Sequence, residues 1–188
     1  MRRGLGILVL TGLALAPWPA RAVDIRIDPQ HSQAQFSVRL LWLRSLNGRF
    51  TGIAGEVTPD PHGRLTVDAR IAVDSLVMDS ARFRRWVLAP DFFDAARYPS
   101  IHFVSDPVAF NVLARGGALD GRLTLRGITR PMHFELLPTP CAPAATTPCL
   151  IEAHGSVRRS DFGMTSHTTV LSDRVRLGLL IALERTPR

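Results

Sequence analysis

The sequence predicts an all-β protein built on an antiparallel sheet. Apolar and polar residues alternate with a period of two along several segments, which gives each predicted strand one apolar and one polar face. Short turn-forming stretches separate these segments, namely Asn47-Gly48, 59–61, Gly116-Gly117 and Gly127. The apolar face of such a sheet must be covered by a second layer or by closure of the sheet on itself. A β-sandwich and a β-barrel are therefore both candidates.

The alternation is clearest in four segments, 34–42, 65–73, 119–126 and 174–181. In the second of these, Leu65, Val67 and Ile71 share one face, with polar residues between them. Shorter runs complete the set of expected strands at 101–105, 108–113, 132–137 and 150–158. Eight or more short strands are expected in total.

A short helical insert around residues 80–96 breaks this pattern. Ser80 is a suitable N-cap, Phe83, Trp86 and Val87 recur at spacings of three and four, and Pro90 ends the helix. A second helical turn is expected over 91–96. Because these aromatic side chains need an apolar surface, we expect the insert to close one end of the sandwich or barrel.

Residues 1–22 have the pattern of a secretory signal peptide. Arg2 and Arg3 precede an apolar run over 5–16, and the small-residue triplet Ala20-Arg21-Ala22 follows. The alternative is an uncleaved membrane anchor, but the run is shorter than the roughly 18 residues that a spanning helix needs. We expect cleavage after Ala22, a single domain over 23–188, and export to the periplasm.

The basic residues do not suggest a nucleic-acid partner. All 23 are arginine, against 16 acidic residues, and they are scattered along alternating strand positions rather than clustered with aromatic residues. A solvated outer face explains them more simply.

Two cysteines, Cys141 and Cys149, flank a stretch rich in proline, threonine and alanine. In an exported protein such a pair is typical of a disulfide that closes a loop. A metal site would need further ligands, which are not nearby in the sequence.

Catalytic and metal-binding motifs are scarce. The six histidines are dispersed, and nucleophile-elbow, phosphate-loop and zinc-helix motifs are absent from the sequence. Asp28, His31 and Ser32 could form a relay, alone or with Asp161, and a hydrolase-like enzyme is one alternative function. The simpler interpretation is that Asp28 and Ser32 cap a turn. No cofactor and no metal are expected.

Six ordered motifs resemble those of the YceI-like family of exported bacterial proteins, over nearly all of the chain from residue 23. They are Asp28-Pro29 with His31-Ser32, the run 48–52, the run 91–94, the run 98–103, the run 121–129 with Pro131, and Arg159 with the run 161–164.

The resemblance implies a lipocalin-like antiparallel β-barrel that holds a polyprenyl or quinone type of isoprenoid lipid without catalysis. The candidate lining residues, including Trp42 and Trp86 from the strand and helix patterns, are Phe36, Val38, Trp42, Phe50, Trp86, Phe92, Phe93, Phe103, Leu123, Leu125, Phe162 and Met164. Candidates for a polar lip around the lipid head group are His31, Ser32, Arg44 and Arg159.

The resemblance has limits. Many relatives have a His-Leu-Arg-Ser-like stretch where this chain has Trp86-Val87-Leu88-Ala89, so no role of those residues transfers, and the Cys141/Cys149 loop is a local addition. A structural or stress-protective module with a filled core is the other alternative function. Transient contact with the inner membrane or with a membrane b-type cytochrome is compatible with the family, as is a monomer or a homodimer.

Overall fold

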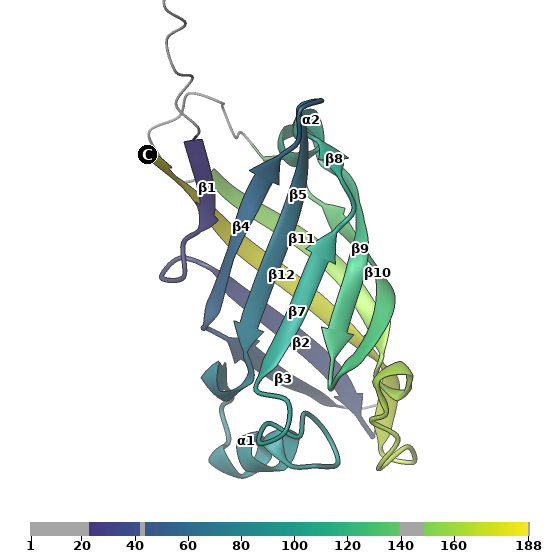
Figure 1. The fold of residues 1–188 in the computed structure, drawn as a ribbon. Coiled ribbons are helices and arrows are strands. Elements are labelled where there is room, and N and C mark those ends of the chain that lie inside the picture. Colours follow the sequence, from purple (N-terminus) through teal and green to yellow (C-terminus); the bar gives the residue numbers. More distant parts are fainter. Residues whose placement is uncertain (1–22, 42–43, 140–148, 188) are drawn as a thin grey trace, which may run out of the picture.

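An antiparallel β-barrel forms the body of the molecule (Figure 1). The computed structural model describes residues 23–41, 44–139 and 149–187. Eight strands close into a ring in the order β1, β4, β5, β7, β9, β10, β11, β12, because β1 pairs with both β4 and β12. Their bounds are β1 Val23–Ile27, β4 Ile53–Pro59, β5 Arg64–Ala72, β7 Ser100–Ser105, β9 Gly117–Leu125, β10 Ile128–Leu136, β11 Cys149–Arg158 and β12 Leu171–Pro187. The barrel alternative of the sequence analysis is confirmed.

The long strand β12 carries two partners along one edge. Its C-terminal part pairs with β1, and its N-terminal part pairs with β2 (Gln33–Leu40). The sheet then continues through β3 (Arg44–Phe50) to the short β6 (Leu76–Val77). This second path extends the wall of the barrel at the end where β12 begins.

Helical segments lie at both ends of the barrel. Helix α1 (Ala81–Leu88) lies at one end and helix α2 (Phe110–Arg115) at the other, and we name the two ends after them (Figure 1). Ser80 caps α1, since its Oγ accepts a hydrogen bond from the Phe83 N–H at 3.4 Å. The helix predicted after Ser80 is confirmed, but the second helical turn expected over 91–96 is not helical: these residues form non-helical turns, and Asp94 has a positive φ of 49°. The remaining elements are η1 (Val73–Ser75), β8 (Val108–Ala109) and η2 (Arg159–Phe162).

Two local predictions were wrong. The run 108–113 is not a strand: β8 ends at Ala109, and α2 follows, ended by Gly116 at φ 80°. Its apolar residues fit a helical turn that buries Leu113 as well as they fit alternation. Asn47-Gly48 is not a hairpin turn, because both residues lie inside β3.

The turn at Gly127 is confirmed. Arg126 and Gly127 both have positive φ, 52° and 71°, and Leu125 pairs with Ile128 across the turn. Two consecutive positive φ angles are what a tight two-residue hairpin requires, and glycine adopts them at little cost.

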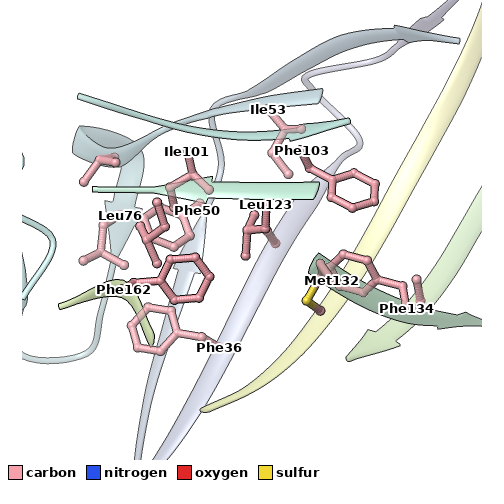
Figure 2. Packing of buried hydrophobic residues seen from close by; sticks show 14 of the residues in the cluster. Phe36, Phe50, Ile53, Leu76, Ile101, Phe103, Leu123, Met132, Phe134 and Phe162 are labelled. Carbon is pink, nitrogen blue, oxygen red and sulfur yellow. The ribbon is translucent and has the colours of Figure 1, made fainter. Parts of the chain in front are cut away.

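Aromatic rings fill much of the interior (Figure 2). Phe36 and Phe50 lie 5.9 Å apart between ring centroids, and each makes a tilted or edge contact with Phe93. Phe103 and Phe134 form a second edge-to-face pair at 5.3 Å. Such pairs stabilise a core by about 0.5–1.5 kcal/mol beyond the burial of their area.

Gly48 makes room for one of these rings, which gives a testable prediction. It lies directly opposite Phe36 on the neighbouring strand, and a Cβ at position 48 would overlap the Phe36 ring. We expect Gly48→Ala to lower the free energy of unfolding by about 1–3 kcal/mol, the usual cost of overpacking. Chemical denaturation measures it.

A matched control lies on β12. A Cβ at Gly178 would meet only the His154 ring nitrogen at 3.9 Å, an ordinary contact, so Gly178→Ala should leave stability unchanged or raise it slightly. Equal destabilisation by both substitutions would contradict the role assigned to Gly48.

Candidate functional site

The interior of the barrel holds an apolar cavity of about 180 Å³. A single buried water needs about 10–15 Å³ on the same scale, so the cavity has room for a much larger molecule. Apolar side chains form nearly all of its wall, and its only polar residues are Gln35 and Arg159. An apolar wall of this kind favours a dry interior or an apolar ligand over bound water.

The strand alternation builds this wall. Inward positions on β2, β5, β7, β9, β10, β11 and β12 all contribute, because every second side chain points into the barrel. Residues of the wall that were not candidates from the sequence include Ile27, Ile53, Val57, Leu119, Phe134 and Ile151. Their alternation was visible in part, but alternation does not distinguish a cavity wall from a filled core.

Segments from both ends of the barrel line the cavity. Val87 of α1, together with Phe92 and Phe93 just after it, lines the α1 end, and Leu113 of α2 lies on the opposite part of the wall. The helical insert therefore lies at one end of the barrel and contributes to the cavity wall there.

The structure brings most of the predicted lining residues together. Nine of them lie on the cavity wall: Phe36, Val38, Phe50, Phe92, Phe93, Phe103, Leu123, Leu125 and Met164. Trp42 lies outside the described residues. Trp86 and Phe162 are not on the wall: Trp86 contacts Phe92 and His167, and Phe162 is fully buried in the core beside the cavity.

Arg159 is the one charged residue on the wall, and its side chain is only 3% exposed. Its guanidinium donates hydrogen bonds to backbone carbonyls, at 2.6 Å to Met164, 2.7 Å to Ser166, 3.2 Å to Ser172 and 3.4 Å to Leu171. Burial lowers the pKa of this guanidinium, and the charge of Asp173 opposes that shift. An arginine stays charged in proteins regardless, so Arg159 places a positive charge at the α1 end of an apolar cavity.

The four candidates for a polar lip do not form one, which corrects that prediction. Arg159 lines the cavity, but Arg44 is exposed at the start of β3. His31 and Ser32 lie in the turn between β1 and β2, on the side of the barrel, where Ser32 Oγ accepts a hydrogen bond from the Ala182 N–H at 3.0 Å. The lip was inferred from proximity to loop ends, and of its four residues only Arg159 lies on the cavity wall.

A catalytic relay is not assembled in this turn. His31 Nδ1 lies 2.5 Å from Asp28 Oδ2, but Ser32 is buried and bonded to β12 rather than to His31. Asp161 lies in η2, where its backbone carbonyl accepts a hydrogen bond from Arg130. The turn-capping interpretation fits, since Asp28 also accepts from the Gln30 N–H at 2.8 Å.

Asp28 makes a pH prediction possible. Hydrogen bonds from His31 and from the Gln30 N–H hold the pKa of its carboxyl below the ordinary value. A lowered pKa in the folded state stabilises the fold fully above the unfolded value near 3.9, and this contribution is lost as pH falls through the folded value. We therefore expect Asp28→Asn to destabilise the fold at pH 7 and to do so less at pH 3. Urea unfolding at both pH values measures the two differences, and a difference that grows toward pH 3 would contradict this role.

A metal centre was also considered within the described part of the chain. Among residues 23–41, 44–139 and 149–187, no three histidine, cysteine, aspartate or glutamate side chains come together in a way that could hold a metal ion. The predicted disulfide involves Cys141, which lies outside the described residues, so it stays a prediction.

Comparison with known proteins identifies the family. The model of the YceI-like domain matches residues 26–183, which is nearly the whole barrel. This chain belongs to the YceI-like family. Among the relatives of this YceI-like chain, a UPF0312 protein of Enterobacter is 30% identical over 191 residues, covering 97% of this chain and 96% of the relative. A UPF0312 protein of Vibrio parahaemolyticus is 34% identical over 137 residues, covering 68% and 71%.

Solved structures show the same fold as this YceI-like barrel. The crystal structure of Burkholderia cenocepacia BcnA has a TM-score of 0.71 at 20% identity, covering 84% of this chain and 99% of that protein. A polyisoprenoid binding domain from Saccharophagus degradans has a TM-score of 0.68 at 14% identity, covering 89% and 100%. At these identities the likeness establishes the barrel architecture.

Within the described part of this YceI-like chain, no helix is both long enough and apolar enough to cross a membrane.

Proposed function

We propose that the protein carries or scavenges an isoprenoid-tailed lipid, of the polyprenyl or quinone type, and binds it non-covalently inside the barrel without catalysis. The observation that carries this proposal is the apolar cavity, whose wall is built by inward side chains of the strands and by segments at both ends. The polyisoprenoid binding domain of Saccharophagus degradans, which shares the fold, supports the same class of ligand.

The physical argument is the insolubility of a prenyl chain. Each methylene removed from water is worth about 0.8 kcal/mol, so a tail of dozens of carbons does not leave a membrane unless an apolar surface covers it. The cavity wall offers such a surface and no partner for a strongly polar tail.

In this proposal the lipid head group lies near Arg159. This guanidinium is the only charge on the wall and lies at the α1 end, so an oxygen of a quinone or phosphate would find its complementary donor there. His31, Ser32 and Arg44 have no part in this arrangement, because they do not line the cavity.

We further propose that the protein works in the periplasm, as the predicted signal peptide suggests, and that it needs no cofactor. A carrier in that compartment would receive its lipid from the inner membrane and hand it back there or to a membrane redox protein such as a b-type cytochrome. It would act as a monomer or a homodimer, since one barrel holds the whole cavity.

Mass spectrometry of an organic extract tests the function. The protein is purified without detergent from a Gram-negative periplasm, and the extract is compared with that of an unrelated exported protein purified in the same way. We expect an isoprenoid or quinone near one molecule per protein. A folded protein without enriched lipid, which also fails to bind an added short-chain quinone, would favour the alternative of a structural module.

A further inference from the structure

Exposed apolar side chains gather at the α1 end of the barrel. Four large apolar residues of the described chain are exposed, and three of them belong to this end: Leu41 at 55%, Val77 at 44% and Phe83 at 37%. The fourth, Leu150, lies at the start of β11, away from this end. Single exposed apolar residues are ordinary, but three at one end of a small barrel suggest a surface that contacts an apolar partner.

A series of contacts joins these residues into one rim. Phe83 contacts Trp86 at 6.3 Å between ring centroids, and Trp86 contacts the His167 ring at 5.1 Å. The chain continues from His167 to Val170, whose carbonyl accepts a hydrogen bond from the Leu41 N–H at 2.8 Å.

Val77 borders the same rim on its other side. It lies in β6, directly before the helical insert, and pairs with Arg49 of β3. Arg84 of α1 holds β6 to the helix, since its Nε donates to the Leu76 carbonyl at 2.7 Å.

The backbone at Leu41 is strained. Its φ is 50°, in the left-handed region that a leucine rarely adopts, and its side chain is the most exposed of the four. The backbone of Leu41 is bonded to Val170, but its exposed side chain makes no evident contribution to folding, so a role in contacting a partner explains the leucine better.

Arginines surround this apolar rim. The β2–β3 hairpin carries exposed Arg39, Arg44 and Arg49, and the sequence from 33 to 55 contains no acidic residue. On the adjoining strands, Arg158 of β11 and Arg174 of β12 lie directly opposite each other. Like charges in that position destabilise a sheet.

The charges of these arginines are not neutralised within the described part of the chain. None of Arg39, Arg44, Arg49, Arg158 and Arg174 forms an ion pair with any described residue.

Helix α1 adds exposed Arg82 and Arg85 to the same end. The acidic residues near this helix are Asp74, Asp79, Asp91 and Asp94, of which Asp94 is buried beside Arg97 and Asp91 lies 4.0 Å from His167. Asp161 and Asp173 lie at the same end, where Asp173 accepts hydrogen bonds from Ser160. The arginines of this end outnumber these acidic residues. The α1 end thus combines an apolar rim with an excess of positive charge.

We propose that the α1 end is a docking surface for a lipid bilayer that contains anionic phospholipids. Leu41, Val77 and Phe83 enter the interfacial region, and the surrounding arginines contact lipid phosphates. The proposal rests on the proposed carrier function, and it identifies where cargo is exchanged.

Both halves of the surface favour a bilayer over other anionic partners. Lipid phosphates attract arginine side chains at the membrane surface, and exposed apolar side chains can enter the interfacial region of the bilayer. A nucleic acid would use the arginines but would leave Leu41 and Val77 in water.

The position of the surface agrees with cargo exchange. Val87, Phe92 and Phe93 form the inner side of the segment whose outer side carries Phe83, so the docked bilayer lies against a segment that lines the cavity. Lipid that leaves the membrane here has the shortest path to the interior.

Vesicle flotation tests this surface. Detergent-free protein is mixed with vesicles of phosphatidylcholine alone or with 30% phosphatidylglycerol, at low and high salt. We expect binding to the anionic vesicles at least tenfold stronger than to neutral ones, weakened by salt. Arg39→Gln with Arg174→Gln should weaken it on the order of 10- to 30-fold. Phe83→Ser with Leu41→Ser should weaken binding at both salt concentrations.

Matched controls come from the rest of the barrel. Leu150→Ser removes the exposed apolar residue outside the rim, and Arg115→Gln with Arg122→Gln removes two exposed charges on α2 and β9. These variants should bind vesicles like the wild type. All variants share one N-terminus, so any contribution of the apolar run over 5–16 is common to them.

Three outcomes would overturn the proposal: equal binding to neutral and anionic vesicles, equal losses in rim and control variants, or rim variants that change only the dimerisation of the protein. The last would identify a second copy of the chain as the occupant.

Binding of a short-chain quinone in solution, without vesicles, is measured on the same variants and reports the cavity alone. If the wild-type protein does not bind the quinone, the carrier function is refuted. If it binds the quinone but not the vesicles, only the docking surface is refuted.

Discussion

Leu123→Asp is expected to abolish lipid binding. Leu123 lies on β9, is 7% exposed, and lines the cavity opposite Phe103 of β7. A carboxylate at this position faces apolar side chains, since the only polar residues on the wall are Gln35 and Arg159, and it either stays hydrated inside the cavity or becomes protonated. In both cases a polar group occupies the position where the prenyl chain would otherwise contact the apolar side chain of Leu123. We expect at least a tenfold loss of co-purified lipid, measured by mass spectrometry per mole of folded protein.

The neighbouring residue provides the control. Arg122 points outward from the same strand, so Arg122→Asp changes the charge more strongly than Leu123→Asp without entering the cavity. Lipid content should stay at the wild-type level in this variant. Circular dichroism and gel filtration establish that both variants are folded.

A second cavity variant avoids a buried charge. Ala153 of β11 is 2% exposed and lies on the wall, so Ala153→Phe places an aromatic ring in the cavity with apolar chemistry unchanged. Filling the space should reduce lipid binding severalfold, at a cost of about 1–3 kcal/mol in stability. If Leu123→Asp and Ala153→Phe both fold and retain a stoichiometric lipid, the lipid does not occupy this cavity.

Arg159→Ala is expected to cause a large loss of stability. The substitution removes the donor for four backbone carbonyls, of which those of Met164 and Leu171 are buried. Each buried acceptor left without a partner costs about 1–3 kcal/mol, so we expect the free energy of unfolding to fall by about 3 kcal/mol. Urea denaturation followed by fluorescence measures the change.

Arg158 tests whether this effect depends on the buried network. It is the adjacent residue, it is exposed, and it lies opposite Arg174, so Arg158→Ala should change stability by less than about 0.5 kcal/mol or raise it slightly. Arg159→Lys should fall between the two, because an ammonium has three donors and lacks the planar fork that reaches several carbonyls at once. A loss as small for Arg159→Ala as for Arg158→Ala would show that the carbonyls find other partners.

Local patterns were sufficient for much of the architecture. The alternation over 65–73 and 119–126 identified β5 and β9, and Ser80 with the apolar spacing after it identified α1. These features depend on near neighbours in the chain, namely side-chain direction along a strand and capping of a helix. The prediction of a strand over 108–113 was wrong for the same reason, since six residues fit both the strand and the helix period.

Long-range contacts decided the features that the sequence analysis missed. Asn47-Gly48 has the composition of a turn, but both residues lie inside a strand, where Gly48 makes room for the ring of Phe36 on the neighbouring strand. β1, β3 and β4 were not among the expected strands, and β1 closes the ring only because it pairs with two strands distant in sequence, β4 and β12.

The candidate site likewise has features that the sequence predicts and features that depend on the tertiary structure. The sequence by itself determined which side chains are apolar and face inward, and nine of the residues expected from the family motifs line the cavity, from Phe36 to Met164. Only the tertiary structure decided that space remains between them, that Arg159 is the charge on the wall, and that His31 and Ser32 lie elsewhere. The physical reason is that side-chain direction follows from the local backbone, whereas cavity volume and the meeting of distant polar groups depend on how all strands close around one axis.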